Sequence, residues 1–192
     1  MVELLGVKPS IWRIIEVPCN YSFWDLHVAI QDAMGWLDYH LHLFSISVPE
    51  EGAPIEVGIP HEEGKMNILP GWDVAIADYF AQPGDHAAYE YDCGDRWLHN
   101  VLLTGILLRD SSTNYPICLA GERACPPEDC GGVSGYYRLI ENLSNTNKSS
   151  HEDMVYWLSN HAKNYWPYRP EEFDPQSVVF WDPKKRLEIA LS

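Results

Sequence analysis

The strongest folding signal in this sequence is a helix between two strand-like runs near the N-terminus. The first run, Ile11–Val17, is rich in β-branched residues, which favour strands. Ser22 can cap a helix with Asp25 as its capping-box-like partner, and apolar residues then repeat at helical spacing. Gly35 is a natural helix stop, and the alternation over Tyr39–Val48 predicts a second strand. A β-α-β unit is therefore expected to open the fold.

A β-hairpin is predicted in the middle of the chain. Its arms are Ala88–Asp92 and Trp97–Leu108, and Gly94 and Asp95 between them supply the turn. The second arm is long and apolar, which is typical of a central strand buried on both faces.

The C-terminal part of the chain is predicted to be largely helical. Val133–Leu143 and His151–His161 carry apolar residues at helical spacing, and a tail rich in proline and aromatic residues follows, which could form a docking strip or a swapped arm. The fold class is therefore α+β: a mainly antiparallel β-sheet opened by a β-α-β unit, with a helical C-terminal half. We expect a single domain over residues 1–192, with a core at about 2–175 and a C-terminal extension at 176–192.

The charge balance limits the kind of partner. The chain has 28 acidic residues against 13 lysines and arginines, for a net charge of −15. Proteins that bind DNA directly usually present a basic patch, because affinity comes largely from neutralising phosphates. Direct nucleic-acid binding is therefore disfavoured, and a protein is the expected partner.

The sequence also predicts a cytoplasmic protein that does not enter a membrane. It has no window of the roughly 18 or more apolar residues that a membrane helix needs. The N-terminus lacks the basic and apolar regions of a signal peptide. Five cysteines in a chain without an export signal favour free thiols or metal ligands over a disulfide framework.

The densest functional candidate is the segment Tyr115–Gly135, which combines cysteines, prolines, glycines and charged residues. Three soft thiolate ligands could hold zinc, with His99 or His151 as a fourth ligand. The spacing of the thiols is C-x6-C-x4-C, longer than the pairs that begin most structural zinc sites. The alternatives are that the thiols pack as small hydrophobic side chains or serve redox or nucleophilic chemistry. The cysteines in question are Cys118, Cys125 and Cys130.

A second candidate is a set of charged residues on the hairpin and on this segment. If the two lie side by side, carboxylates and an imidazole could hold a hard metal ion or perform acid–base catalysis. The alternative is structural: Asp95 organises its turn, Glu128 and Asp129 cap the following helix, and Arg123 bridges to a carboxylate of the hairpin. The candidate catalytic residues are Asp92, Asp95, His99, Glu128 and Asp129.

A third candidate is the histidine pair His40 and His42, with His27 on the preceding helix. Two residues that alternate on a strand project from the same face, which suits a metal ion. The same pattern suits a half-exposed strand without a further role.

Four sequence blocks occur here in one order: IWRIIEVP, YSFWDLHVAIQDAMGW followed by DYHLHLF, YEYDCGDRWLHNVLL, and YPICLAGERACPPEDCGG. Together they resemble the plasmid pRiA4b ORF-3-like family over roughly residues 2–175. The resemblance implies an α+β fold and a link to plasmids and transposable elements, but it assigns no reaction. Cys93 stands where the family's hairpin block usually has phenylalanine, which indicates core packing for that thiol.

The leading hypothesis is a non-enzymatic protein-binding module that uses the segment at 115–135 and the neighbouring hairpin as its recognition surface. In a mobile-element setting, the partner would be a protein such as a recombination or replication factor. One alternative is a metal-dependent enzyme, hydrolase-like, with a carboxylate and histidine site. Another is a domain stabilised by zinc through its cysteines.

Overall fold

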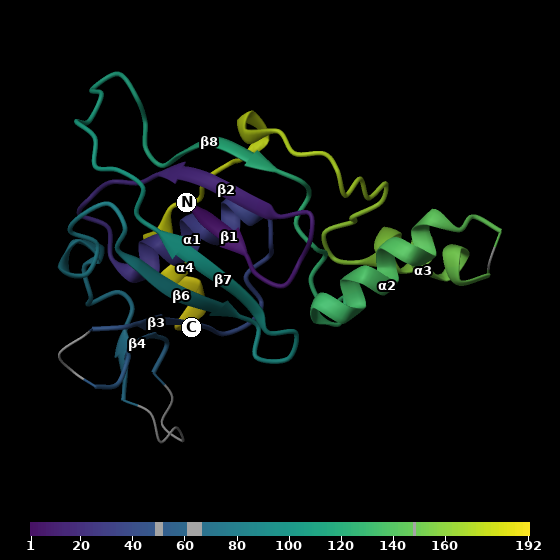
Figure 1. Cartoon of the computed structure of the whole chain (residues 1–192), viewed down its shortest axis with the longest axis horizontal. Helices are drawn as coiled ribbons and strands as arrows, with labels where there is room; N and C mark the ends of the chain where they lie inside the picture. The colour runs from purple at the N-terminus through teal and green to yellow at the C-terminus, as the bar shows by residue number, and fades with distance from the viewer. Residues whose placement is uncertain (49–51, 61–66, 148) are drawn as a thin grey trace.

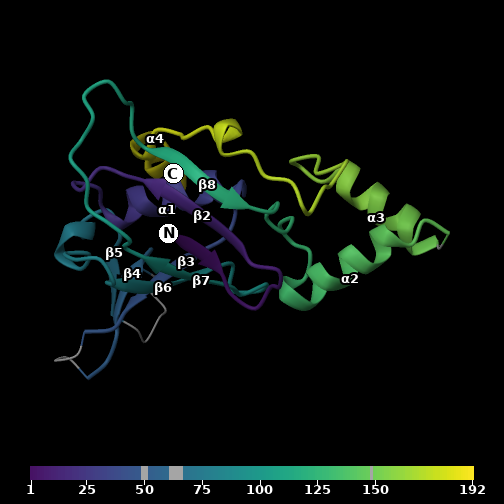
Figure 2. The same ribbon diagram turned by 45° about the horizontal axis from the view of Figure 1, so that its top comes forward.

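An eight-stranded sheet forms the centre of the computed structural model, which describes residues 1–48, 52–60, 67–147 and 149–192. The strand order is β5-β4-β3-β6-β7-β1-β2-β8, and all neighbours are antiparallel except the parallel pair β4 and β5 (Figures 1 and 2). The strands are β1 (Val2–Leu4), β2 (Ile11–Glu16), β3 (His42–Ile46), β4 (Ile55–Gly58), β5 (Ile68–Pro70), β6 (His86–Tyr91), β7 (Trp97–Leu102) and β8 (Ile117–Glu122).

Helices occupy the crossover near the N-terminus and most of the C-terminal part, so the α+β class expected from the sequence is confirmed. None of the helices in the described ranges is long and apolar enough to cross a membrane. The α-helices are α1 (Phe23–Met34), α2 (Gly132–Ser144), α3 (Ser149–Asn160) and α4 (Pro183–Ala190), and the short 3-10 helices are η1 (Ile76–Asp78) and η2 (Pro175–Ser177).

The helix α1 begins and ends where its local sequence predicts. The Ser22 hydroxyl accepts a hydrogen bond from the Asp25 N–H, and the Asp25 carboxylate accepts one from the Ser22 N–H. Gly35 ends the helix in the left-handed conformation, which costs little without a Cβ atom. The helix connects β2 to β3, which run in the same direction with β6, β7 and β1 between them in the sheet.

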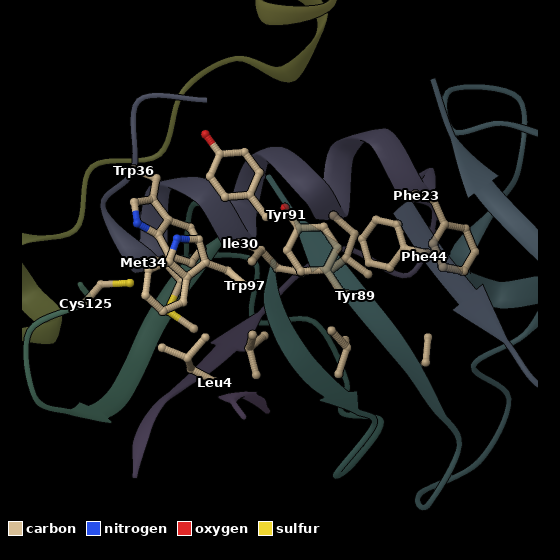
Figure 3. Packing of buried hydrophobic residues seen from close by; sticks show 14 of the residues in the cluster. Leu4, Phe23, Ile30, Met34, Trp36, Phe44, Tyr89, Tyr91, Trp97 and Cys125 are labelled. Carbon is tan, nitrogen blue, oxygen red and sulfur yellow. The ribbon is translucent and has the colours of Figure 1, made fainter. Parts of the chain in front are cut away.

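The core lies between α1 and one face of the sheet. Aromatic side chains of β3, β6 and β7 pack there against the apolar face of the helix (Figure 3). Phe23 and Ile30 of α1 are fully buried, as are Phe44, Tyr89 and Trp97 of the strands. Burial alternates along β6 and β7, so within the described residues the other face of these two strands is more exposed.

The second arm of the hairpin is shorter than the apolar sequence suggests. The strand β7 ends at Leu102, and Leu98 on it is partly exposed, so the expectation of a strand buried on both faces was wrong. Residues 105–108 lie in a loop where Leu108 is 99% exposed. Apolar composition predicted burial there, but the pairing of β7 with β6 and β1 ends at Leu102 and Val101, so these residues lie outside the sheet.

The C-terminal part has two distinct placements. The helices α2 and α3 pack against each other and project away from the sheet (Figures 1 and 2). The chain then returns, and α4 packs against α1. Trp24 Nε1 donates a hydrogen bond to the Pro183 carbonyl at 2.8 Å, and Arg186 Nη2 lies 2.9 Å from Asp32 Oδ1. The segment from 163 to 190, called here the C-terminal arm, thereby runs past the C-terminal end of α1.

Candidate functional site

The loop between β8 and α2 lies against the hairpin of β6 and β7 and against the connection from α1 to β3. Asp95 in the hairpin turn accepts a hydrogen bond from the Gly131 N–H at 3.0 Å. His40 in the connection contacts Asp129 of the loop at 3.0 Å. The segment singled out in the sequence is therefore a junction of three parts of the chain.

Glu128 fastens this junction from inside. Its side chain is buried, Oε1 accepts a hydrogen bond from the Tyr91 hydroxyl at 2.5 Å, and Oε2 accepts one from the Leu37 N–H at 2.7 Å. The Glu128 N–H donates to the Tyr165 hydroxyl at 3.3 Å. Burial, with the neighbouring Glu128 carboxylate, raises the pKa of Tyr91 far above its usual range. Both carboxylate oxygens are engaged, which gives Glu128 a structural role.

Asp92 shapes the hairpin turn, whereas the structural interpretation of the sequence had assigned that role to Asp95. Asp92 Oδ1 accepts hydrogen bonds from the N–H groups of Gly94 at 2.8 Å and Asp95 at 3.3 Å. Asp95 is engaged with the loop, whereas Asp92 Oδ2 points toward His40, 3.6 Å from its Nε2 atom. One oxygen of Asp92 is thus left for a further partner.

His40, Asp92 and Asp129 come together as one polar cluster. Each offers one ligand atom, and these atoms lie within 4.8 Å of one another. His161 at the end of α3 lies beside them, with Nε2 3.8 Å from Asp129 Oδ2. We call these four residues the His-Asp cluster. Sequence reasoning selected Asp92 and Asp129 but assigned His40 to a different candidate and did not consider His161.

The expected histidine pair separates because β3 begins only at His42. His40 precedes the strand and faces the loop, whereas His42 is buried and stacks on His27 with ring centroids 3.4 Å apart. His27 in turn contacts Asp38 at 2.9 Å and the Tyr89 hydroxyl at 2.8 Å. Burial and the neighbouring His27 hold the pKa of His42 well below its usual value.

His99 lies in the core and not in the cluster. Its Nδ1–H donates to the Tyr89 carbonyl at 3.3 Å, and the ring packs edge-on against Trp36. Burial lowers the pKa of His99 to about 4. Its side chain points to the face of β7 that α1 covers, which removes it from the loop chemistry.

The cysteines of the loop segment do not meet. Within the described residues, one group of three potential metal ligands comes within 4.8 Å, and it consists of His40, Asp92 and Asp129. The three thiols, all in described parts of the chain, form no such group. Cys118 lies partly buried on β8, Cys125 is buried beneath the loop and Cys130 is partly buried near its end. Burial raises the pKa of Cys125 to about 12, so this thiol is protonated at neutral pH. The arrangement favours packing for these side chains.

A groove of about 1260 Å³ lies on the other side of the loop, between the C-terminal end of α1 and the C-terminal arm. Ala124, Cys125 and Pro126 contribute the loop's part of its wall. Arg123 beside them pairs with Glu171 of the arm, and not with the hairpin as expected from the sequence. Aromatic residues of the groove are Trp36, Tyr39, Tyr165, Tyr168, Phe173 and Trp181.

The buried cation of the groove is Arg13 on β2. Its guanidinium donates to four carbonyl oxygens at 2.8–3.0 Å and lies 3.5 Å from the centre of the Phe173 ring. Burial lowers its pKa from the usual arginine value. The Arg13 side chain thereby contacts β2, the C-terminal end of α1, the loop after β8 and the C-terminal arm.

The cations nearer the surface of the groove differ in their pairing. Arg186 lies between Asp32 and Asp38, at 2.9 Å and 3.6 Å. Lys163 has no carboxylate within 4.0 Å in the part of the chain that the structure describes, and burial lowers its pKa. The groove therefore combines aromatic surface with charges of both signs.

Comparison with known proteins agrees with the fold and the sequence blocks. The chain is 29% identical over 157 residues to the uncharacterized protein y4hQ of Sinorhizobium fredii, covering 81% of this chain and 77% of that protein. The crystal structure of a protein of unknown function, MM3350 from Methanosarcina mazei Go1, is similar with a TM-score of 0.81 and 40% identity, over 93% of this chain and 95% of that one. The sequence model of the plasmid pRiA4b ORF-3-like protein matches residues 1–177. The chain belongs to the plasmid pRiA4b ORF-3-like family.

Proposed function

We propose that this protein is an interaction module that binds an extended segment of a partner protein in the groove between α1 and the C-terminal arm. The groove itself carries the proposal. Pockets for small molecules usually measure roughly 300–1,000 Å³, whereas this groove is open and measures about 1260 Å³. An open groove of this size suits a peptide segment better than an enclosed small ligand.

The rim of the groove supplies the residue types that dominate protein interfaces. Trp181 is 60% exposed on the arm, and Tyr39 and Val179 are also exposed. Tryptophan and tyrosine are enriched among residues that contribute most to binding, because they bury much area with few rotatable bonds. These side chains would contact apolar residues of the partner.

Charge favours a basic partner. The whole chain carries a net charge of −15, and the exposed carboxylates of Glu171 and Glu172 line the groove, paired with Arg123 and Arg169. Opposite charge accelerates association and disfavours wrong partners. We therefore expect the bound segment to combine apolar residues with lysine or arginine.

The proposal refines the recognition surface expected from the sequence. The hairpin of β6 and β7 contributes no residue to the groove, whereas the loop contributes its first part, from Ala124 to Pro126. The hairpin instead supports the loop through Asp95 and Tyr91. In this proposal the hairpin supports the loop from outside the groove, whereas the C-terminal arm contacts the bound segment.

The test is selection from a displayed library of random peptides, followed by fluorescence anisotropy of the enriched peptides. We expect peptides rich in basic and apolar residues, and about 30-fold weaker binding to the Trp181→Ala variant, the loss typical of a dominant interface residue. Leu108→Ala is the matched control, because Leu108 is exposed but lies outside the groove. Failure to enrich any binding peptide, or equal losses in both variants, would contradict the proposal.

A further inference from the structure

We propose that His40, Asp92 and Asp129 bind one divalent transition-metal ion, and that His161 orients the Asp129 carboxylate from outside the ligand set. This site is separate from the groove and does not depend on it. The three ligand residues come from the α1–β3 connection, the end of β6 and the loop before α2. An ion bound there would join three parts of the chain that are distant in sequence.

The spacing of the ligand atoms fits one ion. Histidine nitrogen and carboxylate oxygen lie at about 2.0–2.2 Å from zinc, which places neighbouring ligand atoms roughly 3.0–3.6 Å apart. His40 Nε2 lies 3.0 Å from Asp129 Oδ1 and 3.6 Å from Asp92 Oδ2. The third pair, Asp92 and Asp129, has its ligand atoms within 4.8 Å of each other.

In Asp92 and His40, the atom that would bind the ion forms no hydrogen bond with the backbone of the described residues, and the second polar atom of each side chain faces elsewhere. The Gly94 and Asp95 N–H groups occupy Asp92 Oδ1 and leave Oδ2 facing His40. No hydrogen bond to His40 Nδ1 is formed by the described residues, and the side chain is 30% exposed, so Nδ1 can keep the ring proton toward solvent. His40 Nε2 then presents its lone pair to the ion, as a ligating imidazole must.

His161 supplies an observation independent of the three ligands. Its side chain is only 9% exposed, and its Nδ1 accepts a hydrogen bond from the Lys163 N–H at 3.3 Å. The ring proton of the neutral histidine is then on Nε2, which is 3.8 Å from Asp129 Oδ2 and forms no hydrogen bond within the described residues. This N–H lies beside the carboxylate. Metal-binding carboxylates are usually held by such hydrogen bonds from outside the ligand shell.

The donor set indicates the class of ion. One imidazole with two carboxylates suits Zn²⁺ or Mn²⁺ better than Ca²⁺, which takes oxygen ligands, or soft ions that prefer thiolates. Asp129 is 53% exposed, so water can complete the coordination. The ion would also neutralise two carboxylates that otherwise repel each other at short range.

The test is isothermal titration of chelator-treated full-length protein with Mn²⁺ and Zn²⁺, together with the absorption spectrum of the Co²⁺-loaded protein. We expect one ion per chain, a higher melting temperature with metal, and a Co²⁺ spectrum without the near-ultraviolet band that thiolate ligands give. His161→Leu should weaken binding by about 10–100-fold, the usual effect of removing an outer-shell partner. His40→Ala and Asp129→Asn should weaken binding more strongly than that.

Matched controls are His86→Ala and Asp153→Asn, which change exposed residues of the same types outside the His-Asp cluster. Both controls should bind metal as the unmodified protein does. Asp129→Asn preserves the shape of an exposed side chain, so loss of binding in a variant with an unchanged metal-free melting temperature supports the site. Absence of binding, a thiolate band with Co²⁺, or undiminished binding by His40→Ala and Asp129→Asn would overturn it.

Discussion

The Tyr91 hydroxyl donates a 2.5 Å hydrogen bond to Glu128 Oε1 in the buried space beneath the loop that follows β8. The next residue in the chain, Asp129, faces the opposite way and contacts His40. Of these two consecutive acidic residues, the buried Glu128 fixes the loop, and the exposed Asp129 belongs to the His-Asp cluster. The inner contact fixes the loop, and the loop in turn positions one wall of the groove and one member of the His-Asp cluster.

Replacing Tyr91 by phenylalanine should destabilise the protein by about 1–3 kcal/mol, because the Glu128 carboxylate loses a buried hydrogen-bond donor. Equilibrium unfolding in urea measures this loss. Tyr39→Phe is the control, because Tyr39 is exposed and should change stability by no more than about 0.5 kcal/mol. Equal effects of the two substitutions would show that the buried contact does not fix the loop.

Gly135→Ala should destabilise the protein by about 1–3 kcal/mol or more, the usual range for overpacking. A Cβ atom at this position would overlap the Cys130 carbonyl oxygen at the start of α2. Gly105→Ala meets open space in the exposed loop after β7 and should be nearly neutral. The melting temperatures of both variants test this difference. An unchanged melting temperature for Gly135→Ala would show that Gly135 does not pack closely against the Cys130 carbonyl.

Stability should fall as the pH is lowered from about 6.5 to about 4, because His99 is neutral in the folded protein. Burial lowers its pKa to about 4, while an unfolded histidine titrates near 6.5. The unfolded chain therefore takes up a proton first, and His99 alone accounts for a loss of roughly 3 kcal/mol across this interval. The pKa of His42 is lowered as well and adds a loss in the same direction.

Urea unfolding at a series of pH values measures this dependence. His99→Asn keeps a donor for the Tyr89 carbonyl but cannot take up a proton, so its stability should depend less steeply on pH. Exposed His86→Asn should retain the full slope. A slope that His99→Asn leaves unchanged would assign the acid sensitivity to other groups.

Arg186→Ala should release α4 from α1. The guanidinium lies between the buried Asp32 and the nearly buried Asp38, and a buried carboxylate that loses its charged partner costs roughly 1–3 kcal/mol. Hydrogen exchange of the amides at 183–190 should accelerate, while exchange in the central strands stays slow. The neighbouring Lys185→Ala should leave exchange unchanged, because Lys185 is exposed and forms no ion pair within 4.0 Å in the described ranges.

Much of the fold could be predicted because its signals are local. The capping box at Ser22 and Asp25, the stop at Gly35 and the turn before Trp97 each act within a few residues. The limits of α2 and α3 follow from helical periodicity in the same way. The extent of β7 could not be predicted from composition, because it depends on where the partner strands β1 and β6 end.

The candidate sites were less predictable because they join distant segments. Asp92 and Asp129 could be selected as carboxylates near turns, but their partner His40 depends on where β3 begins. His161 reaches the cluster only because α3 ends beside the loop. The groove depends on the return of the C-terminal arm to α1, and the only sequence signal for that return was the proline and aromatic content of the tail.

The measurement that tests the proposed function most directly is hydrogen–deuterium exchange of the protein with and without a peptide selected for binding. Residues 32–39 and 163–190 contribute most of the groove lining, so we expect slower exchange in both segments when the peptide is bound. Exchange in α2, which contributes no residue to the groove, should not change. Protection confined to α2 and α3, or to the exposed loop at 105–108, would contradict peptide binding in the groove.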